Sequence, residues 1–209
     1  LTADKTLCSD VHKVFQQITG MGQKIHPKVL IHAPFNLRTS LLSMISVEKN
    51  AAKEGRPARI IAKLNALTDP GLIKALYSAS MAGVKIDLIV RGMCCLRPQM
   101  PGISQNIQVI SVIGRFLEHS RVYYFQNSQP NVFCSSADWM ERNLSNRIEV
   151  CFPILKKKHA LRILEELSLY LSDEAQKWAL TESGNYAPDN EHYKYSDCVQ
   201  NKLLEALDH

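Results

Sequence analysis

The 209-residue sequence contains no run of 18 apolar residues, so no membrane-spanning helix is predicted. Its opening, LTADKTLCSD, has neither the charged start nor the apolar stretch of a secretory signal peptide. We therefore expect a cytoplasmic protein without stable membrane insertion, and leave open membrane association of a longer, full-length protein. The lack of an initial methionine predicts that the chain is a piece of such a longer protein.

Several motifs of metal and nucleotide chemistry are also missing. The six cysteines form no C-x-x-C pair, which argues against a zinc knuckle and, in a reducing compartment, predicts free thiols. There is no G-x-x-x-x-G-K-S/T loop and no G-x-G-x-x-G loop, which excludes phosphoryl transfer of the P-loop or protein-kinase kind. A formal net charge of +5 fits a polyanionic ligand or an ordinary basic surface equally well.

The apolar pattern predicts an α/β fold. The stretches ARIIAKL (58–64) and VKIDLIV (84–90) are nearly continuously apolar, as expected for parallel strands covered on both faces. Between them a helix is predicted, with Asp69 as its N-cap and Gly83 as its stop, so this part is a βαβ unit. Further helices are predicted at 9–19, 36–55, 157–180 and 198–209, further strands at 28–33, 105–113, 120–125, 131–137 and 146–154, and an irregular segment at 181–197.

The stretch GRFLEHSRVYYF (114–125) places a histidine and a cation two residues apart at the start of a predicted strand. Because side chains at i and i+2 share a face, His119 and Arg121 point together, which suits a phosphate held by two charge-assisted bonds. Downstream, CSSADWMERN brings a turn of small residues and then Asp138. Taken alone, these residues also allow a histidine satisfied in the strand beside an exposed arginine.

The order histidine, cation at +2 and then small-small-x-acid resembles the H-x-K and G-S-x-N pattern of the phospholipase D superfamily. In that superfamily, paired histidines from two similar halves act on a phosphate ester. This sequence departs from the pattern at two positions, since Arg121 replaces the lysine and Asp138 replaces the asparagine.

Longer stretches resemble the C-terminal catalytic domain of bacterial polyphosphate kinase, an ATP:polyphosphate phosphotransferase. The resemblance runs from residue 1 to about residue 180 and includes LIVRGMC, FLEHSR and SSADWMERN. It implies a phospholipase-D-like α/β domain with a mixed, mostly parallel sheet flanked by helices. It also implies that residues 1–27 complete a first phospholipase-D-like half and that residues 28–209 form the second.

This resemblance assigns roles to individual residues. Arg91 in VRGMC matches an arginine that binds the ATP phosphates. His119 in LEHSR matches the second histidine of the active site, which contacts the nucleotide phosphate and assists transfer. Arg121 and Asp138 match the two remaining corners of the motif, as a phosphate ligand and as a carboxylate that orients the imidazole.

Three weaker candidates follow from their positions. Lys63 and Asn65 end a predicted strand at the edge where α/β sheets bind ligands and could touch phosphates, although a strand-end lysine is more often simply solvated. Arg115 lies four residues before His119 and is either a second cation facing polyphosphate or part of a salt bridge.

By this resemblance, the parent protein reversibly transfers the γ-phosphate of ATP to inorganic polyphosphate and releases ADP. The route passes through a phosphohistidine on a histidine upstream of residue 1, so the isolated chain is expected to be inactive. Magnesium would neutralise the phosphates, with its ligands upstream and no metal ligand in this chain. The expected partners are ATP, ADP and polyphosphate, not nucleic acid, and the full-length protein is expected to be a homo-oligomer.

Two other functions remain open at this point. A phospholipase-D-like phosphodiesterase or nuclease would work as a dimer, with His119 supplied twice across a two-fold axis. The arginine and aspartate at the two altered motif positions count against it. A non-catalytic polyanion-binding or oligomerisation module has only the mild positive charge in its favour.

Overall fold

The computed structural model of the chain describes residues 2–20, 27–173, 175–189 and 198–206. A nine-stranded sheet has the order β1-β7-β6-β5-β2-β3-β4-β8-β9. Its strands are β1 (Ile31–Ala33), β2 (Arg59–Leu64), β3 (Lys85–Val90), β4 (Ile107–Ser111), β5 (Arg121–Phe125), β6 (Val132–Ser135), β7 (Glu149–Pro153), β8 (Trp178–Leu180) and β9 (Tyr186–Pro188). The helices are α1 (Lys5–Ile18), α2 (Leu37–Lys53), α3 (Pro70–Met81), α4 (Glu141–Ser145), α5 (Lys157–Leu171) and α6 (Val199–Glu205). None of the helices in these ranges is long and apolar enough to cross a membrane.

The sheet is mixed, as predicted. The β2-α3-β3 unit is parallel, and β3 also pairs with β4 in parallel. The other six neighbouring pairs are antiparallel, so the expectation of a mostly parallel sheet is wrong. The reason lies in the connections: β5 to β6 and β8 to β9 are joined by short turns without a crossover helix, and only antiparallel neighbours can be joined in this way.

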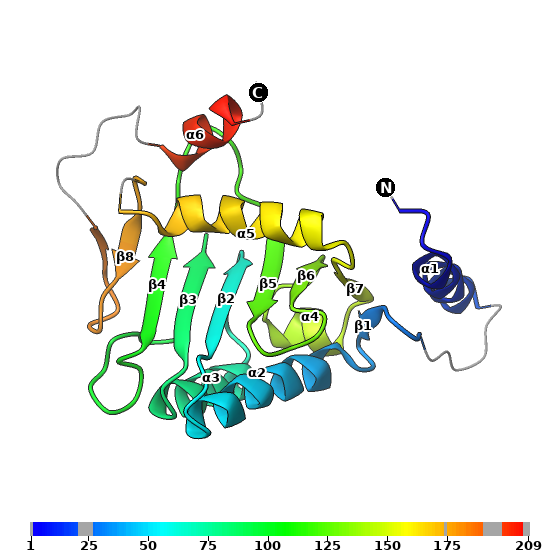
Figure 1. Cartoon of the computed structure of the whole chain (residues 1–209), viewed down its shortest axis with the longest axis horizontal. Helices are drawn as coiled ribbons and strands as arrows, with labels where there is room; N and C mark the ends of the chain where they lie inside the picture. The colour runs from blue at the N-terminus through cyan, green and yellow to red at the C-terminus, as the bar shows by residue number, and fades with distance from the viewer. Residues whose placement is uncertain (1, 21–26, 174, 190–197, 207–209) are drawn as a thin grey trace.

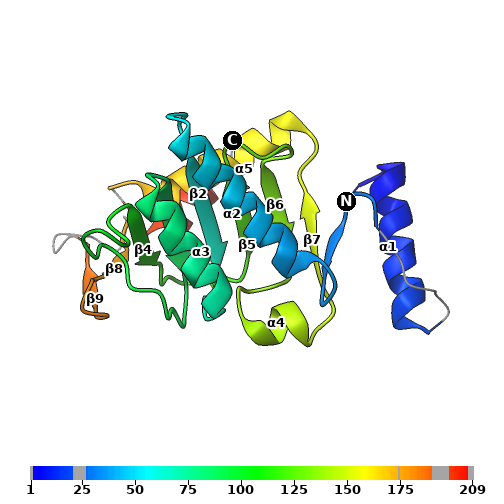
Figure 2. The ribbon, with the colours of Figure 1, turned by 90° about the horizontal axis from the view of Figure 1, so that it is seen from below.

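Helices cover both faces of the sheet, so its central strands are buried on both sides. In β2, Ile60 and Leu64 belong to a core shared with α2 and α3, whereas Ile61 belongs to a second core shared with α5 and α6. Figures 1 and 2 show α2 and α3 on one side of the sheet and α5 on the other. Lys63 follows Ile61 by two residues, so its side chain projects toward α5.

The predicted signals at both ends of α3 are present. The Asp69 carboxylate accepts a hydrogen bond from the backbone N–H of Leu72 at 2.8 Å, and Pro70 is the first helical residue. Gly83 follows the helix with φ +99°, a conformation that side-chain-bearing residues rarely adopt. Local chemistry therefore fixes where this helix begins and ends.

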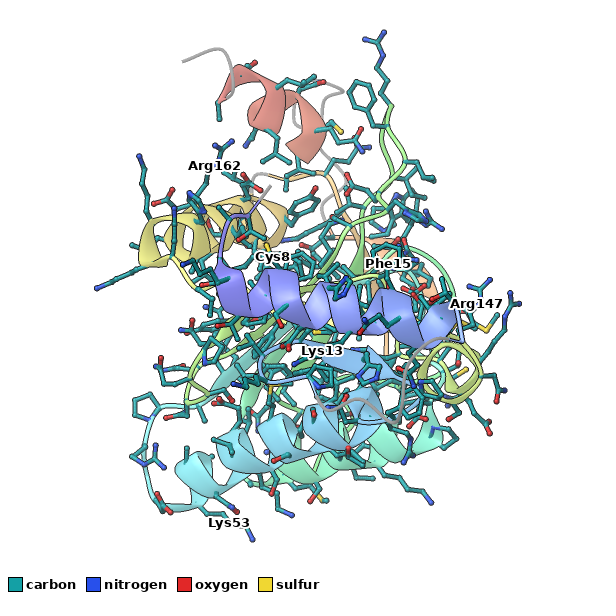
Figure 3. All side chains as sticks on the ribbon, turned by 90° about the vertical axis from the view of Figure 1, so that its right-hand side faces the viewer. Cys8, Lys13, Phe15, Lys53, Arg147 and Arg162 are labelled. Carbon is teal, nitrogen blue, oxygen red and sulfur yellow. The ribbon has the colours of Figure 1, made fainter. Side chains whose placement is uncertain are left out.

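Helix α1 begins earlier than predicted, with Asp4 as its N-cap. Asp10, which was expected at the helix start, lies inside the helix and is buried; its carboxylate accepts bonds from the backbone N–H groups of Val29 and Leu30 at 2.8 and 3.1 Å. Burial raises the pKa of Asp10, but these bonds outweigh it and the pKa is lowered. They tie α1 to the segment before β1, while Phe15 on α1 remains exposed (Figure 3).

The prediction of one long helix over 157–180 is wrong at its C-terminal end. Helix α5 ends at Leu171, and Trp178–Leu180 form β8 beside β4. The buried Lys177 ammonium donates to the backbone carbonyls of Leu171 and Ser172 and so caps the C-terminal end of α5.

In the segment predicted to be irregular, β9 pairs with β8, and residues 190–197 lie outside the described part. The terminal helix is present as α6, with residues 207–209 also outside it.

His32 in β1 is 1% exposed. Within the described ranges neither of its ring nitrogens has a hydrogen-bond partner, and the ring lies 4.7 Å from the Phe35 ring, centroid to centroid. Burial lowers the pKa of His32, because the imidazolium form would lose its hydration. The folded chain therefore favours the neutral ring.

This burial predicts a pH-dependent stability. Below the ordinary histidine pKa of about 6.5, the unfolded chain binds a proton that the folded chain resists. The contribution of His32 should be complete above that pH and should fall as the pH is lowered through it, by up to about 1.4 kcal/mol per pH unit. In urea unfolding, His32→Asn should flatten the free-energy curve between roughly pH 5 and 7. His12→Asn, on the exposed face of α1, should keep the wild-type slope; equal slopes for all three proteins would contradict this.

Candidate functional site

Three strands bring the predicted residues to one edge of the sheet. Because β2 and β3 are parallel, Lys63, Asn65 and Arg91 lie at their common carboxyl edge. Strand β5 is antiparallel to β2, and the pairing of Val122 with Lys63 places the start of β5 at that same edge. The loop before β5, which holds His119, therefore reaches the residues that follow β2 and β3. This is the edge at which open α/β sheets bind ligands.

Asp138 connects several of these elements and is 7% exposed. Its Oδ1 accepts from the backbone N–H of Asn65 at 2.7 Å and from the Asn65 side-chain amide at 3.2 Å. Arg121 forms a bidentate pair with it, Nε to Oδ1 at 3.2 Å and Nη2 to Oδ2 at 3.0 Å. Next to Asp138, the buried Trp139 ring packs against Tyr123, with 5.2 Å between centroids. The turn after β6 is thus fixed to the ends of β2 and β5.

Arg121 also contacts His119, as the i, i+2 spacing predicts. Its Nη1 lies 3.1 Å from His119 Nδ1 and donates to the His119 carbonyl at 2.9 Å. A guanidinium has only donors, so Nδ1 must accept, and the proton of the neutral imidazole is on Nε2. The exposed ring therefore presents an N–H donor. Arg121 stands between Asp138 and His119, so the carboxylate acts on the imidazole through the guanidinium.

Arg91 follows the last residue of β3 and is half-buried. Its Nη1 donates to the Glu118 carbonyl at 3.2 Å, and its own carbonyl accepts from the Ser111 hydroxyl at 3.2 Å. The guanidinium consequently lies beside the peptide that leads into His119. A planar cation and a neighbouring N–H donor can bind a phosphate by charge-assisted hydrogen bonds.

Lys63 is 4% exposed, and its ammonium is engaged. Nζ lies 2.8 Å from Glu118 Oε2 and 2.8 Å from the Ser120 hydroxyl, and 5.1 Å from the centroid of the Tyr170 ring. Glu118 also accepts from the Tyr170 hydroxyl at 3.0 Å and from Gln200 Nε2 at 2.7 Å. Burial raises the pKa of Glu118, but these donors outweigh it, so the pKa is lowered and the carboxylate is ionised.

Arg115 is exposed in the loop between β4 and β5, with its guanidinium 5.7 Å from the Phe116 ring centroid. Among the interactions of the described residues, none joins Arg115 to Arg91 or His119.

Two residues that bind Glu118, Tyr170 and Gln200, were not singled out from the sequence. They lie 52 and 82 residues from Glu118 and belong to no local motif. Gln200 lies in the predicted terminal helix, at a position that the structure buries.

A shallow groove opens at the opposite edge of the sheet, where β2 and β3 begin, and includes Arg56, Arg59 and Lys85. Arg59 is paired with Asp87 at 2.7 Å and Arg56 with Glu54 at 2.7 Å. Two of its cations are therefore neutralised within the chain. None of the predicted site residues lines this groove, so we place the candidate site at the carboxyl edge on the basis of side-chain chemistry.

The described residues do not fit a magnesium site. In those ranges, no group of three or more histidine, cysteine, aspartate or glutamate side chains gathers in a way that could hold a metal ion. Both carboxylates at the candidate site already accept hydrogen bonds from protein groups. Asp138 accepts from Arg121 and from backbone amides, and Glu118 accepts from Lys63 and two further donors. That magnesium is bound by upstream residues stays a prediction.

Comparisons with known proteins agree on one family. A family model described as "Polyphosphate kinase C-terminal domain 2" matches residues 30–200. A polyphosphate kinase of Pseudomonas aeruginosa is 57% identical over 187 residues, which cover 89% of this chain and 27% of that protein. The chain thus spans little more than a quarter of this relative. The division into parts at residues 27 and 28 is not tested by these matches.

Solved structures agree with the fold. The crystal structure of polyphosphate kinase from Porphyromonas gingivalis superimposes with a TM-score of 0.91 at 36% identity, covering 99% of this chain and 32% of that chain. NucT from Helicobacter pylori superimposes with a TM-score of 0.51 at 18% identity, covering 68% of this chain and 93% of that chain, which shows a shared fold alone. The α/β fold predicted from the sequence, with a mixed sheet flanked by helices, is confirmed.

Proposed function

The chain belongs to the family of C-terminal domain 2 of polyphosphate kinases, and from this premise we propose that it supplies part of an active site for polyphosphate synthesis. In the proposed reaction the γ-phosphate of ATP passes reversibly to inorganic polyphosphate. The observation that supports this is the meeting of Arg91 and His119 at the Glu118 peptide. The Arg91 cation contacts the peptide that leads into His119, whose ring carries an N–H donor, at the edge of the sheet suited to an anionic ligand.

The proposed chemistry consists of two displacements. The bond between the γ-phosphorus and the oxygen that bridges to the β-phosphate breaks, and ADP leaves with that oxygen. The phosphoryl group passes to a histidine outside this chain, forming a P–N bond, and then to a terminal oxygen of polyphosphate. The same steps in reverse regenerate ATP.

In this proposal each residue of the site has a distinct task. Arg91 holds negative charge on the nucleotide phosphates, and the His119 Nε2–H donates to a phosphate oxygen as charge develops on it. Arg121 keeps Nδ1 of His119 occupied, and Asp138 fixes Arg121. Magnesium, when bound with ATP, would neutralise phosphate charge from ligands outside this chain. Homo-oligomerisation of the full-length protein stays a prediction.

Arg91→Ala provides the test, in a full-length polyphosphate kinase that contains this segment. We expect kcat/KM for ATP to fall roughly 100-fold, because a donor aimed at developing phosphate charge is lost. Arg97→Ala, in the exposed part of the same loop, is the matched control and should stay within about twofold of wild type. ADP release and polyphosphate formation are both measured. An unchanged kcat/KM in Arg91→Ala would remove the main support for the proposal.

A further inference from the structure

The loop between β4 and β5 is held at its histidine end by a half-buried carboxylate. Glu118 directly precedes His119, and its side chain receives Lys63 from β2, Tyr170 from α5 and Gln200 from α6. Three elements of the fold therefore converge on one residue of this loop. The Glu118 carbonyl also accepts from Arg91, but the backbone of Arg91 is fixed at the end of β3, so a shift of Glu118 acts chiefly on the adjoining His119.

Gln200 also binds the same loop at a second residue, Phe116. Its Oε1 accepts from the backbone N–H of Phe116 at 2.8 Å, and its Nε2 donates to the Phe116 carbonyl at 2.8 Å. A primary amide can bind both the backbone N–H and the backbone carbonyl of one residue, because it has an acceptor oxygen and N–H donors. A carboxylate or an aliphatic side chain cannot do so. Gln200 is 5% exposed, so water cannot easily replace these bonds.

Gly114 shows how closely this glutamine approaches the loop. A Cβ atom at position 114 would collide with the Gln200 amide and would lie 3.0 Å from the Cys198 sulfur. Glycine at this position therefore leaves the space that the amide occupies. The loop and α6 fit one another at two places, at Gly114 and at Phe116.

We propose that Gln200 is a positioning residue for phosphoryl transfer, which holds the loop so that the His119 imidazole meets the phosphate. This inference rests on the proposed function, since it requires that His119 assists the transfer. The route of action is short: Gln200 binds Glu118 and Phe116, and Glu118 is bonded to His119 through one peptide. Gln200 itself does not touch the reacting atoms in this scheme.

The test is a double-mutant cycle in a full-length polyphosphate kinase that contains this segment, with kcat for polyphosphate synthesis as the readout. Gln200→Leu should lower kcat roughly 10- to 100-fold when His119 is present, as expected for a displaced catalytic group. In the His119→Ala background, the same change should cost less than about twofold, because Gln200 acts through the imidazole. Gln126→Leu, which alters a glutamine at the opposite edge of the sheet, should leave kcat within about twofold of wild type.

Each other outcome decides against the inference. Equal losses in the two backgrounds would show that Gln200 serves only the fold, and the role of His119 would stand. If His119→Ala leaves kcat unchanged, the proposed function fails and this inference fails with it. Should Gln200→Leu not fold, Gln200→Glu removes the donor with little change in shape, and Gly114→Ala displaces the amide from the loop side. Both enter the same cycle, with the same expected results.

Discussion

Asp138→Ala is expected to lower the free energy of unfolding of the chain by about 3–5 kcal/mol, the range for removing one partner of a buried ion pair. The change leaves the largely buried Arg121 guanidinium without its bidentate acceptor and the backbone N–H of Asn65 without the oxygen at 2.7 Å. Buried groups left unpaired cost more than the intact bond contributes. Chemical denaturation of the 209-residue chain, followed by circular dichroism, measures the change.

Asp138→Asn shows whether the charge or the shape of Asp138 matters, and Glu54→Ala serves as a control at an exposed ion pair. Asp138→Asn keeps an oxygen for the Asn65 amide but removes the charge that faces Arg121, so an intermediate loss of about 1–3 kcal/mol is expected. Glu54→Ala removes an ion pair with Arg56 that is shorter but exposed, and should cost less than about 1 kcal/mol. If Asp138→Ala were as mild as Glu54→Ala, Asp138 would not brace this edge of the sheet.

His119→Ala should lower kcat for polyphosphate synthesis roughly 100- to 10,000-fold in a full-length polyphosphate kinase that contains this segment, the range for losing a proton-donating side chain. The fold should be preserved, because the imidazole is exposed and the Arg121 pair with Asp138 does not depend on it. Steady-state kinetics with ATP and a polyphosphate primer, together with thermal unfolding, measure the two effects separately.

His119→Gln distinguishes a hydrogen-bond donor from an acid. Glutamine retains an N–H donor but cannot release a proton, so recovery of at least about tenfold in kcat over His119→Ala would indicate donation. Recovery below that level would indicate that the role of His119 needs the imidazole ring itself and not an N–H donor alone. His159→Ala, on the exposed surface of α5, is the matched control. A His119→Ala enzyme with near wild-type kcat would refute the role of His119 in either form.

The fold could be predicted from the sequence where its signals are local. The apolar runs of β2 and β3 and the Asp69 cap and Gly83 stop of α3 all act within a few residues. The place of β5 beside β2 could not be predicted, because an apolar strand does not specify its neighbour or its direction. Likewise, the apolar spacing typical of a helix continues beyond Leu171, where α5 ends. The lysine that binds the carbonyls at the end of α5, Lys177, cannot be told from a solvated lysine by its neighbours in the sequence.

The site was predictable to the extent that its residues belong to motifs. His119, Arg121 and Asp138 stand in a recognisable order, and the structure brings them into one network. Lys63 was expected to face solvent or phosphate, but its place two residues after Ile61 turns it toward α5 and Glu118. Such a pairing depends on which helix covers the strand, which the local pattern does not contain.

The contact between α6 and the histidine loop has a consequence for protein synthesis. Gln200 lies 82 residues after Glu118, so a ribosome adding about 5–20 residues per second reaches it roughly 4–16 s later. Throughout that interval the nascent chain contains the loop but not the amide that binds Phe116. However early the central strands pair, the proposed phosphate site acquires this anchor only when translation delivers α6.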